Sequence, residues 1–403
     1  MHVAFWLGEL TVEAGGVGPY AKRLLRSVSR SLKGSPMRLS VLVTERSLQA
    51  AQKELGETGL EMVAVPDGND SASRLRRRAQ RVIRRAGNLL ARSYADEDQS
   101  SEPLDRTLRN LGSRLLHSPY QLPPWFTKAA PYVVTMHDLQ ELHYPQFFTA
   151  EVRKFRAINY QRSLEESRHV VVSFDHVKRD ICRNFDVAND KVTVIPLPFT
   201  DCTLRQPSED EARTLANRFA GVRYLLYPAQ TWEHKNHLAL LKAFELLHSE
   251  HGLDVHLVLT GKQDSRFFPV LSDAIAKSPV ASKVHLEGLV SEGALRWFYE
   301  HAALVAIPTK YEAGSFPMME AMQLGAPVIA SNVTSLPDTM GAREFLFDPN
   351  SPDELARLAT KMLQDDAFRE ANLRNSRQRI AELSQDKSGD LLLDLWSRLA
   401  ARH

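Results

Sequence analysis

Cysteine and long apolar runs are both scarce in this chain of 403 residues. Its two cysteines, Cys182 and Cys202, cannot supply a disulfide framework, and no Cys/His cluster has the spacing of a zinc site. No apolar run approaches the ~20 residues that a membrane span needs. The N-terminal MHVAFWL begins a strand-like run without the basic region and cleavage site of a signal peptide. These absences exclude a disulfide-stapled scaffold and predict a cytoplasmic globular protein.

Acidic residues are missing from one segment. Residues 71–95 contain eight arginines and no Asp or Glu, although the net charge of the whole chain is only +2. The remaining chain therefore has 43 basic side chains against 49 acidic ones. This basic segment needs its own explanation.

Short apolar runs alternate with longer helical patterns, among them 19–32, which is expected to begin at Pro19, and 149–164. Such uninterrupted runs are typical of parallel strands that helices cover on both faces. The pattern restarts after a polar stretch near residue 200, which predicts an α/β fold with two doubly wound domains. Strands are expected at 2–7, 38–43, 61–65, 132–136, 170–173 and 192–195, then at 224–227, 255–260, 284–288, 304–307, 328–330 and 345–347.

The domains are expected at residues 1–200 and 201–388. The first would contain a basic helical insert at about 71–95. A final helix at about 389–401 is a candidate to cross back to the first domain.

Two glutamates, Glu312 and Glu320, stand in the segment YEAGSFPMMEAM. Pro317 suits the first position of a helix, and Ser315 or Phe316 suits its cap. Both carboxylates would then overlook the carboxyl edge of a parallel sheet, where open α/β domains bind ligands. The free N–H groups at the helix start favour an anion. The alternative is a pair of surface glutamates near an ordinary turn.

This segment, together with GAPVIAS at 325–331, resembles the E-x7-E signature of the retaining family-4 glycosyltransferases. GGVG at 15–18, HDL at 137–139 and YPAQTWEHKN at 227–236 occur in the family's order. The resemblance covers nearly the whole chain and implies the GT-B fold, in which two Rossmann-like domains face a cleft. Because glycogen and sucrose synthases share parts of these motifs, it indicates the superfamily more than the substrate.

The resemblance implies a hexosyltransferase that uses a nucleotide-sugar donor and no other cofactor. Glu320 would accept hydrogen bonds from the ribose hydroxyls. Glu312 would accept one from a sugar hydroxyl, helped by backbone N–H groups of Gly314, Ser315 and Phe316.

Lys235 matches the family's phosphate-binding lysine, although an exposed lysine in a helix's first turn is the alternative. A compact ammonium can stabilise a leaving diphosphate without a metal. Many members have Gly-Arg five residues before this lysine, where the present chain has Ala229 and Gln230. Gln230 would bond the phosphate without adding a charge. This variant resembles a subgroup that includes mannosyltransferases, and it is the basis for expecting GDP-mannose.

Two motifs of the first half are expected at the same cleft. Glycine lets the backbone approach a phosphate or sugar closely. The resemblance places Gly16 near the donor phosphate, and Gly15 and Gly18 on the acceptor side with Asp138. It gives His137 a contact to the transferred sugar. The alternatives are a plain connecting loop and a strand-end histidine satisfied by Asp138.

No nucleophile and base pair stands out. The resemblance implies a front-face displacement in which the departing phosphate oxygen takes the acceptor's proton, so the protein supplies positioning and electrostatics. The D-x-D sequence at 96–98 lies in an acidic polar stretch with no strand before it, and we interpret it as a solvated loop. No metal is expected.

Other functions stay open at this point. The expected acceptor is a glycan or lipid-linked saccharide of bacterial polysaccharide assembly. A nucleotide-sugar epimerase or phosphorylase of the same fold is an alternative, as is a non-catalytic glycan-binding or scaffold subunit. Nucleic acid is not an expected partner, because no aromatic stacking platform accompanies the arginines.

The basic segment, drawn as a helix, has one apolar face and one arginine face. Such a helix can lie on anionic lipid at the inner face of the membrane, or pack on the first domain with its arginines solvated. The arginines expected to contact lipid are Arg77, Arg78, Arg81, Arg84 and Arg85. The apolar face consists of Leu75, Ala79, Val82, Ile83, Ala86, Leu89 and Leu90.

Overall fold

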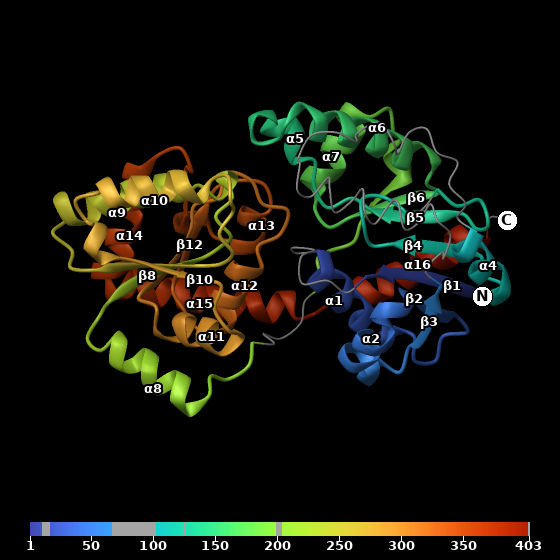
Figure 1. Ribbon diagram of the computed structural model, residues 1–403, viewed down its shortest axis with the longest axis horizontal. Helices are drawn as coiled ribbons and strands as arrows, with labels where there is room; N and C mark the ends of the chain where they lie inside the picture. The colour runs from blue at the N-terminus through green and yellow to red at the C-terminus, as the bar shows by residue number, and fades with distance from the viewer. Residues whose placement is uncertain (10–16, 67–101, 125, 199–203, 402–403) are drawn as a thin grey trace. The chain divides into compact units, whose positions relative to one another are not determined.

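The structure is a computed structural model that describes residues 1–9, 17–66, 102–124, 126–198 and 204–401. It comprises an N-terminal unit, Met1–Pro198 with Asp386–His403, and a C-terminal unit, Phe199–Gln385 (Figure 1). The division falls next to the boundary expected near residue 200. The basic segment 71–95, with all five arginines expected to contact lipid, lies outside the described residues, as do Gly15, Gly16 and the D-x-D sequence.

A parallel sheet with the strand order β3-β2-β1-β4-β5-β6-β7 forms the middle of the N-terminal unit. In its register, Phe5 lies opposite Val41 on one side and His117 on the other. The strands are β1 (His2–Gly8), β2 (Arg38–Thr44), β3 (Glu61–Val65), β4 (Leu115–Ser118), β5 (Tyr132–Thr135), β6 (His169–Val172) and β7 (Val192–Val194).

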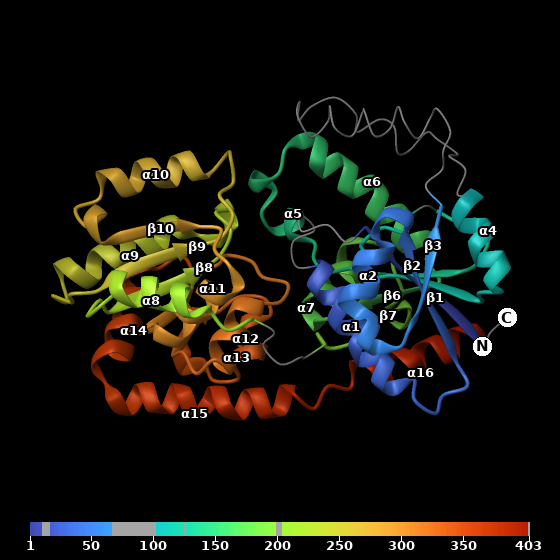
Figure 2. The ribbon, with the colours of Figure 1, turned by 60° about the horizontal axis from the view of Figure 1, so that its bottom comes forward.

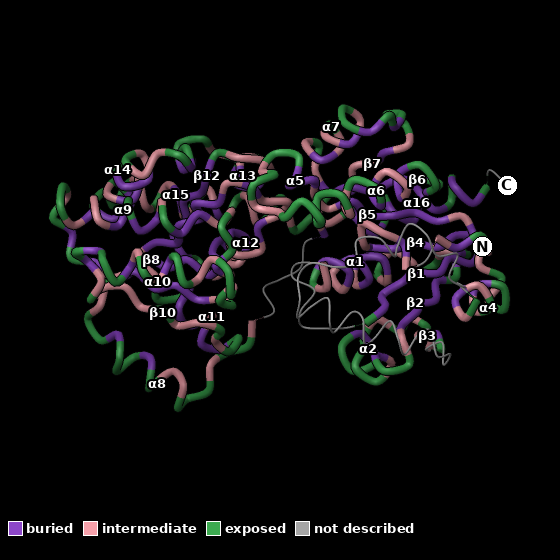
Figure 3. Tube along the Cα trace, turned by 45° about the horizontal axis from the view of Figure 1, so that its top comes forward, coloured by how far each residue is buried: buried purple, intermediate pink, exposed green. Residues whose placement is uncertain are grey.

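Helices cover both faces of this sheet because its strands are apolar on both sides. In β1, Val3, Phe5 and Leu7 belong to one core and Ala4 and Trp6 to the other. The first core is shared with α1 (Val17–Ser31), α2 (Leu48–Leu55) and α16 (Ser388–Ala401). The second is shared with α4 (Glu102–Leu111), α6 (Ala150–Glu166) and α7 (Asp175–Asn184), while α5 (Gln140–His143) follows β5. In Figure 3 the strands are mostly buried.

Strand β4 is absent from the sequence-based prediction. Its segment reads LLHS, and both polar residues, His117 and Ser118, are fully buried. The His117 ring is satisfied at both nitrogens, since Trp396 Nε1 donates to Nδ1 at 3.1 Å and Nε2 bonds Thr135 Oγ1 at 3.0 Å. Polar groups that are hydrogen-bonded can be buried at little cost. Because two of its four residues are polar, β4 does not form an apolar run, and the hydrophobicity of the sequence does not indicate a strand here.

Helix α16 packs against α1 within the N-terminal unit. The Gly389 N–H donates to Ser27 Oγ at 2.9 Å. A Cβ on Gly389 would lie 2.6 Å from the Ser27 carbonyl oxygen, so the close approach of the two helices needs glycine here. The last helix of the chain therefore completes the core that the first strand begins.

The C-terminal unit contains a second parallel sheet, with the strand order β10-β9-β8-β11-β12-β13. Leu225 of the central strand β8 lies opposite Leu257 and Leu304. The strands are β8 (Tyr224–Pro228), β9 (His256–Thr260), β10 (Val284–Gly288), β11 (Leu304–Ile307), β12 (Val328–Ser331) and β13 (Leu346–Phe347).

Figures 1 and 2 show helices on both faces of this sheet. The strand order reverses between β8 and β11, and ligands of open α/β sheets bind outside the carboxyl ends of the strands at such a point. The helices are α8 (Glu209–Arg218), α9 (His237–Ser249), α10 (Phe268–Lys277), α11 (Glu292–His301), α12 (Phe316–Gln323), α13 (Leu336–Met340), α14 (Pro352–Gln364) and α15 (Asp366–Leu383).

Buried neutral histidines predict that both units lose stability in mild acid. Burial lowers the pKa to about 3 for His117, His234 and His237, and to about 4 for His169. The unfolded chain therefore binds more protons than the folded chain below about pH 6.5. Each such histidine should remove up to ~1.4 kcal/mol of unfolding free energy per pH unit below that value.

We expect the melting temperature to fall steadily from pH 6.5 to pH 5, before most carboxylates titrate. Thermal unfolding followed by circular dichroism in buffers of constant ionic strength measures this dependence. A melting temperature that is constant between pH 7 and pH 5 would contradict it.

Candidate functional site

Two oppositely charged side chains meet at the carboxyl ends of β8 and β11. Lys235 ends the short 3-10 helix Glu233–Lys235 that follows β8, and Glu312 lies on the loop after β11. Lys235 Nζ donates to Glu312 Oε2 at 2.6 Å, and the two side chains are 16% and 14% exposed. The structure thus brings together two residues that are 77 positions apart in the sequence.

The backbone around Lys235 is fixed by two neighbours. The Tyr227 hydroxyl donates to the Lys235 carbonyl oxygen at 2.9 Å. Asn236 has a left-handed backbone with φ of 63°, and its buried Nδ2 donates to the carbonyl oxygens of Pro308 at 2.9 Å and Pro349 at 2.7 Å. Asn236 therefore links the loops after β8, β11 and β13, and it tolerates a conformation that most side chains avoid.

Glu312 is held by the loop that follows β12. Its N–H donates to Thr334 Oγ1 at 3.1 Å, and its carbonyl oxygen accepts from the hydroxyls of Thr334 at 2.7 Å and Ser335 at 3.0 Å. The loops carrying Lys235 and Glu312 are joined directly, because the Lys310 N–H donates to the His234 carbonyl oxygen at 2.8 Å. The ion pair is therefore built on a rigid backbone frame.

Helix α12 begins four residues after Glu312. Ser315 is the N-cap, and its hydroxyl accepts from the Met318 N–H at 3.3 Å. The prediction that Pro317 is the first helical residue is wrong by one position, since the helix begins at Phe316. Proline is tolerated anywhere in the first turn, where its missing N–H has no partner to lose. Gly314 immediately precedes this cap.

Glu320 lies one turn inside α12 and is half-buried. The Tyr299 hydroxyl, from α11, donates to Glu320 Oε2 at 3.0 Å. Tyr299 itself is fully buried. Glu312 and Glu320 therefore have different partners, a lysine in one case and a phenol in the other.

Gln230 follows β8 on a loop that continues beside the end of β9. The N–H groups of Ala229 and Thr231 donate at 3.0 Å to the carbonyl oxygens of Thr260 and Lys262. Gly261, with φ of 119°, allows this approach, because a Cβ there would lie 2.6 Å from the Ala229 backbone. The half-exposed Gln230 thus sits at the same sheet edge as Lys235.

Neutral imidazoles flank the lysine. Burial lowers the pKa of His234 and of His237 to about 3, and the positive charge of Lys235 contributes to both shifts. At neutral pH these rings add no positive charge, so the positive charge of the loop after β8, residues 229–236, comes from Lys235.

His137 lies two residues beyond the end of β5, within the N-terminal unit. Its Nε2 donates to the Pro119 carbonyl oxygen at 2.8 Å, and its ring meets Tyr20 edge-on with centroids 4.8 Å apart. Burial lowers the pKa of His137, so the ring is neutral at pH 7. The Nε2 bond leaves Nδ1 as the hydrogen-bond acceptor.

The alternative that Asp138 satisfies His137 is not what the structure shows. The Asp138 carboxylate accepts from Gln121 Nε2 at 3.3 Å and lies 3.9 Å from Arg156 Nη1. Gly18 lies in the first turn of α1, which begins at Val17 rather than at the expected Pro19.

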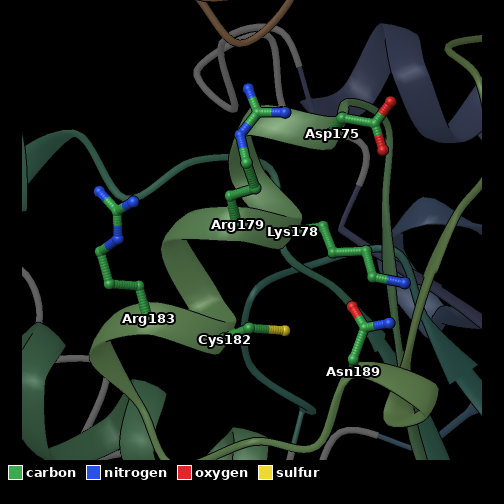
Figure 4. Close-up of a pocket in the computed structure, with 6 residues that line it drawn as sticks. All are labelled: Asp175, Lys178, Arg179, Cys182, Arg183 and Asn189. Atoms are coloured by element: carbon green, nitrogen blue, oxygen red, sulfur yellow. The ribbon is translucent and has the colours of Figure 1, made fainter.

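A separate surface hollow of the N-terminal unit is formed by α7 and the turn that follows it (Figure 4). The sequence-predicted site residues are not among those that line it, but it carries the free thiol of Cys182 beside basic side chains. The lining residues are Asp175, Lys178, Arg179, Cys182, Arg183 and Asn189.

Sequence reasoning missed the residues that support the site. Tyr227, Asn236 and Tyr299 act through backbone carbonyls or a carboxylate, and Gly261 acts by close approach. Among these four residues, Asn236 alone has a signal in the sequence, because asparagine tolerates a left-handed backbone, and this signal is weak. Within the described ranges, no group of three or more His, Cys, Asp or Glu could hold a metal ion, and no helix is long and apolar enough to cross a membrane.

Two family models match this chain, one in each unit. The family model described as Glycosyltransferase Family 4 matches residues 44–200, and the model described as Glycosyl transferases group 1 matches residues 209–382. Sucrose-phosphate synthase from Thermosynechococcus elongatus has a similar structure, with a TM-score of 0.72 and 18% identity over 100% of both chains. The predicted GT-B fold is confirmed, and both units carry glycosyltransferase domains.

The curated relatives of this chain, all at modest identity, include mannosyltransferases. The chain is 28% identical to O-antigen chain mannosyltransferase B of Escherichia coli over 265 residues, which are 65% of this chain and 68% of that protein. It is 24% identical to the serotype-specific mannosyltransferase WbdA of Escherichia coli over 281 residues, which are 68% of this chain and 34% of that protein. The alignment thus spans about a third of WbdA.

We predict that Asn236→Asp destabilises the C-terminal unit by about 1–3 kcal/mol. The substitution replaces a donor that faces two carbonyl oxygens with a carboxylate, leaving buried acceptors without partners. Asn236→Gly keeps the left-handed backbone but removes both hydrogen bonds, so it should destabilise less than Asp. Urea unfolding of the purified protein measures both effects.

The matched control is Asn184→Asp. This exposed asparagine donates to a single carbonyl oxygen, that of Asp180, and its substitution should change stability by less than about 0.5 kcal/mol. Equal stability of the Asn236→Asp variant and the unmodified protein would refute the linking role of Asn236.

Proposed function

We propose that this protein is a retaining hexosyltransferase that uses a nucleotide sugar, with mannose as the transferred sugar. The acceptor is a glycan or a lipid-linked saccharide in bacterial polysaccharide assembly. The observation that carries the proposal is the juxtaposition of Lys235 with Glu312 at the ligand-binding edge of the C-terminal sheet. Glu320 and the start of α12 lie on the segment that continues from Glu312.

The donor groups have complementary partners in this arrangement. A diphosphate is dianionic or more, so Lys235 and the positive end of the α12 helix dipole suit it. Glu312, once its lysine turns to phosphate, accepts from a hydroxyl of the sugar. Glu320 accepts from the ribose hydroxyls, and Gln230 donates an amide hydrogen to a phosphate oxygen.

Transfer needs one bond to form and one to break at the sugar's anomeric carbon. The acceptor hydroxyl attacks from the face that the diphosphate leaves, so the anomeric configuration is retained. The acceptor's proton passes to the departing phosphate oxygen. Lys235 stabilises the charge that develops on this leaving group, and no metal is required.

Two observations support GDP-mannose as the donor. The relatives reported above are named mannosyltransferases, and the loop at 229–236 has the variant with glutamine in place of arginine. Because the alignments cover only parts of those proteins, donor and acceptor are proposals for this chain. We place the reaction in the cytoplasm.

A non-catalytic glycan-binding or scaffold subunit is the second candidate. The specific observation in its favour is Gln230, which leaves one expected cation missing from the phosphate site. Release of GDP from GDP-mannose that depends on an added acceptor distinguishes a transferase from this subunit and from an epimerase.

We predict that Lys235→Ala and Glu312→Gln each lower the rate of transfer by roughly 10²–10³-fold, because each removes a group aimed at charge or position in the transition state. The rate is measured as acceptor-dependent GDP release, with and without EDTA, and EDTA should have no effect. Lys242→Ala is the control, since Lys242 is an exposed partner of Glu245 on α9.

Unmodified turnover in either variant would remove these residues from the site. Inhibition by EDTA that added Mg²⁺ reverses would contradict the metal-free mechanism. A protein whose melting temperature no nucleotide sugar raises would contradict the donor itself, since a ligand that binds the native state stabilises it.

Membrane docking through residues 71–95 is a further part of the proposal. Each basic residue near an anionic surface contributes ~1 kcal/mol, so half of the eight arginines would give reversible binding. We predict flotation with anionic liposomes that weakens with salt and is lost when Arg77, Arg78, Arg81, Arg84 and Arg85 become Ser. Equal binding to neutral vesicles, or none to anionic ones, would refute docking.

A further inference from the structure

Three buried tyrosines of the C-terminal unit differ in what their hydroxyls bind. Tyr224, Tyr227 and Tyr299 are each at most 1% exposed. Tyr224 donates to the Phe298 carbonyl oxygen and Tyr227 to that of Lys235, both at 2.9 Å. Tyr299 instead donates to a side-chain carboxylate, Glu320 Oε2, at 3.0 Å.

The contact of Tyr299 is anchored to the first turns of α12. Its hydroxyl also lies 3.3 Å from the carbonyl oxygen of Pro317, one turn before Glu320. The phenol thus meets the helix and its carboxylate at once. A hydrogen bond to a carboxylate is stronger than one between neutral groups, and burial of the phenol strengthens it further.

A phenylalanine at position 299 would fill the same space, so packing alone does not explain the hydroxyl. A buried hydroxyl is unfavourable unless it is bonded, and here the bond goes to a half-buried carboxylate on a helix. A carboxylate offers about four lone-pair sites, so the bond from Tyr299 does not by itself prevent Glu320 from accepting a hydrogen bond from a ribose hydroxyl.

We propose that Tyr299 is a positioning residue that orients Glu320 toward the ribose of the donor. It does not touch the nucleotide; it limits the rotamers of the glutamate that does. This inference rests on the proposed donor role of Glu320. Its specific consequence is that Tyr299 contributes to affinity only when the ligand has ribose hydroxyls.

The test compares Tyr299→Phe with Tyr224→Phe. Both variants delete one hydroxyl from a buried tyrosine of the same unit, and both should lower the melting temperature by about 2–4 °C. Calorimetry first measures the affinity of GDP, UDP, CDP and ADP for the unmodified protein. The nucleotide that binds most tightly, and its 2′,3′-dideoxy analogue, are then measured with every variant.

We expect Tyr299→Phe to bind the ribonucleotide roughly five- to tenfold more weakly, because the bond it loses is to a charged group. It should bind the dideoxy analogue as the unmodified protein does. Tyr224→Phe should keep the ratio of the two affinities. Glu320→Gln should lose the same discrimination, and adding Tyr299→Phe to it should have little further effect on the ratio.

Each outcome decides one statement. If Tyr299→Phe weakens both ligands equally, or neither, Tyr299 is structural and the inference is wrong while the donor site stands. If Tyr299→Phe does not fold, the Glu320→Gln ratio decides, and an unchanged ratio overturns the inference. If the unmodified protein binds none of the four nucleotides, the proposed function fails and the inference fails with it.

Discussion

The ion pair between Lys235 and Glu312 is the interaction around which the C-terminal site is arranged. Bringing either charge to a position that is about one-seventh exposed is unfavourable without a partner. In the absence of ligand, each charge supplies the partner of the other. An anionic ligand can replace Glu312 at the ammonium, and a hydroxyl can replace Lys235 at the carboxylate. Under the proposed function, the pair keeps the two groups that bind the donor in place at low electrostatic cost until the donor arrives.

The backbone that carries this pair is hydrogen-bonded to the neighbouring loops. Loops after four parallel strands converge here, and main-chain groups at loop ends have no ladder partners. Side chains form hydrogen bonds with them instead. Asn236 donates to the carbonyl oxygens of two prolines, and Tyr227 donates to the carbonyl oxygen of Lys235. Thr334 bonds both the N–H and the carbonyl oxygen of Glu312. The same hydrogen bonds that satisfy the buried backbone therefore also fix the charged groups.

The sequence allowed the two sheets and the placement of Lys235 and Glu312 after strands to be predicted, because apolar runs and a strand–loop–helix pattern are local signals. It did not allow prediction of β4, whose His117 is satisfied by Trp396, 279 residues away. The residues that support the site, such as Tyr299, were not predicted for the same reason, because their partners are distant in the sequence. Tyr299 looks like an ordinary core aromatic until α12 is placed beside it, and helix starts were misplaced by one or two positions because proline fits several places in a first turn.

The N-terminal unit shows a different consequence of long-range pairing. Its core includes Leu392, Leu395 and Trp396 of α16, all nearly or fully buried, although the chain passes through the whole C-terminal unit before it reaches them. A fragment ending at residue 198 would expose the matching face of α1 and leave His117 Nδ1 without its donor. Because an unsatisfied buried group and exposed apolar surface both oppose folding, the first unit depends on the last helix. The N-terminal unit is therefore built from two segments of the chain, one before and one after the C-terminal unit.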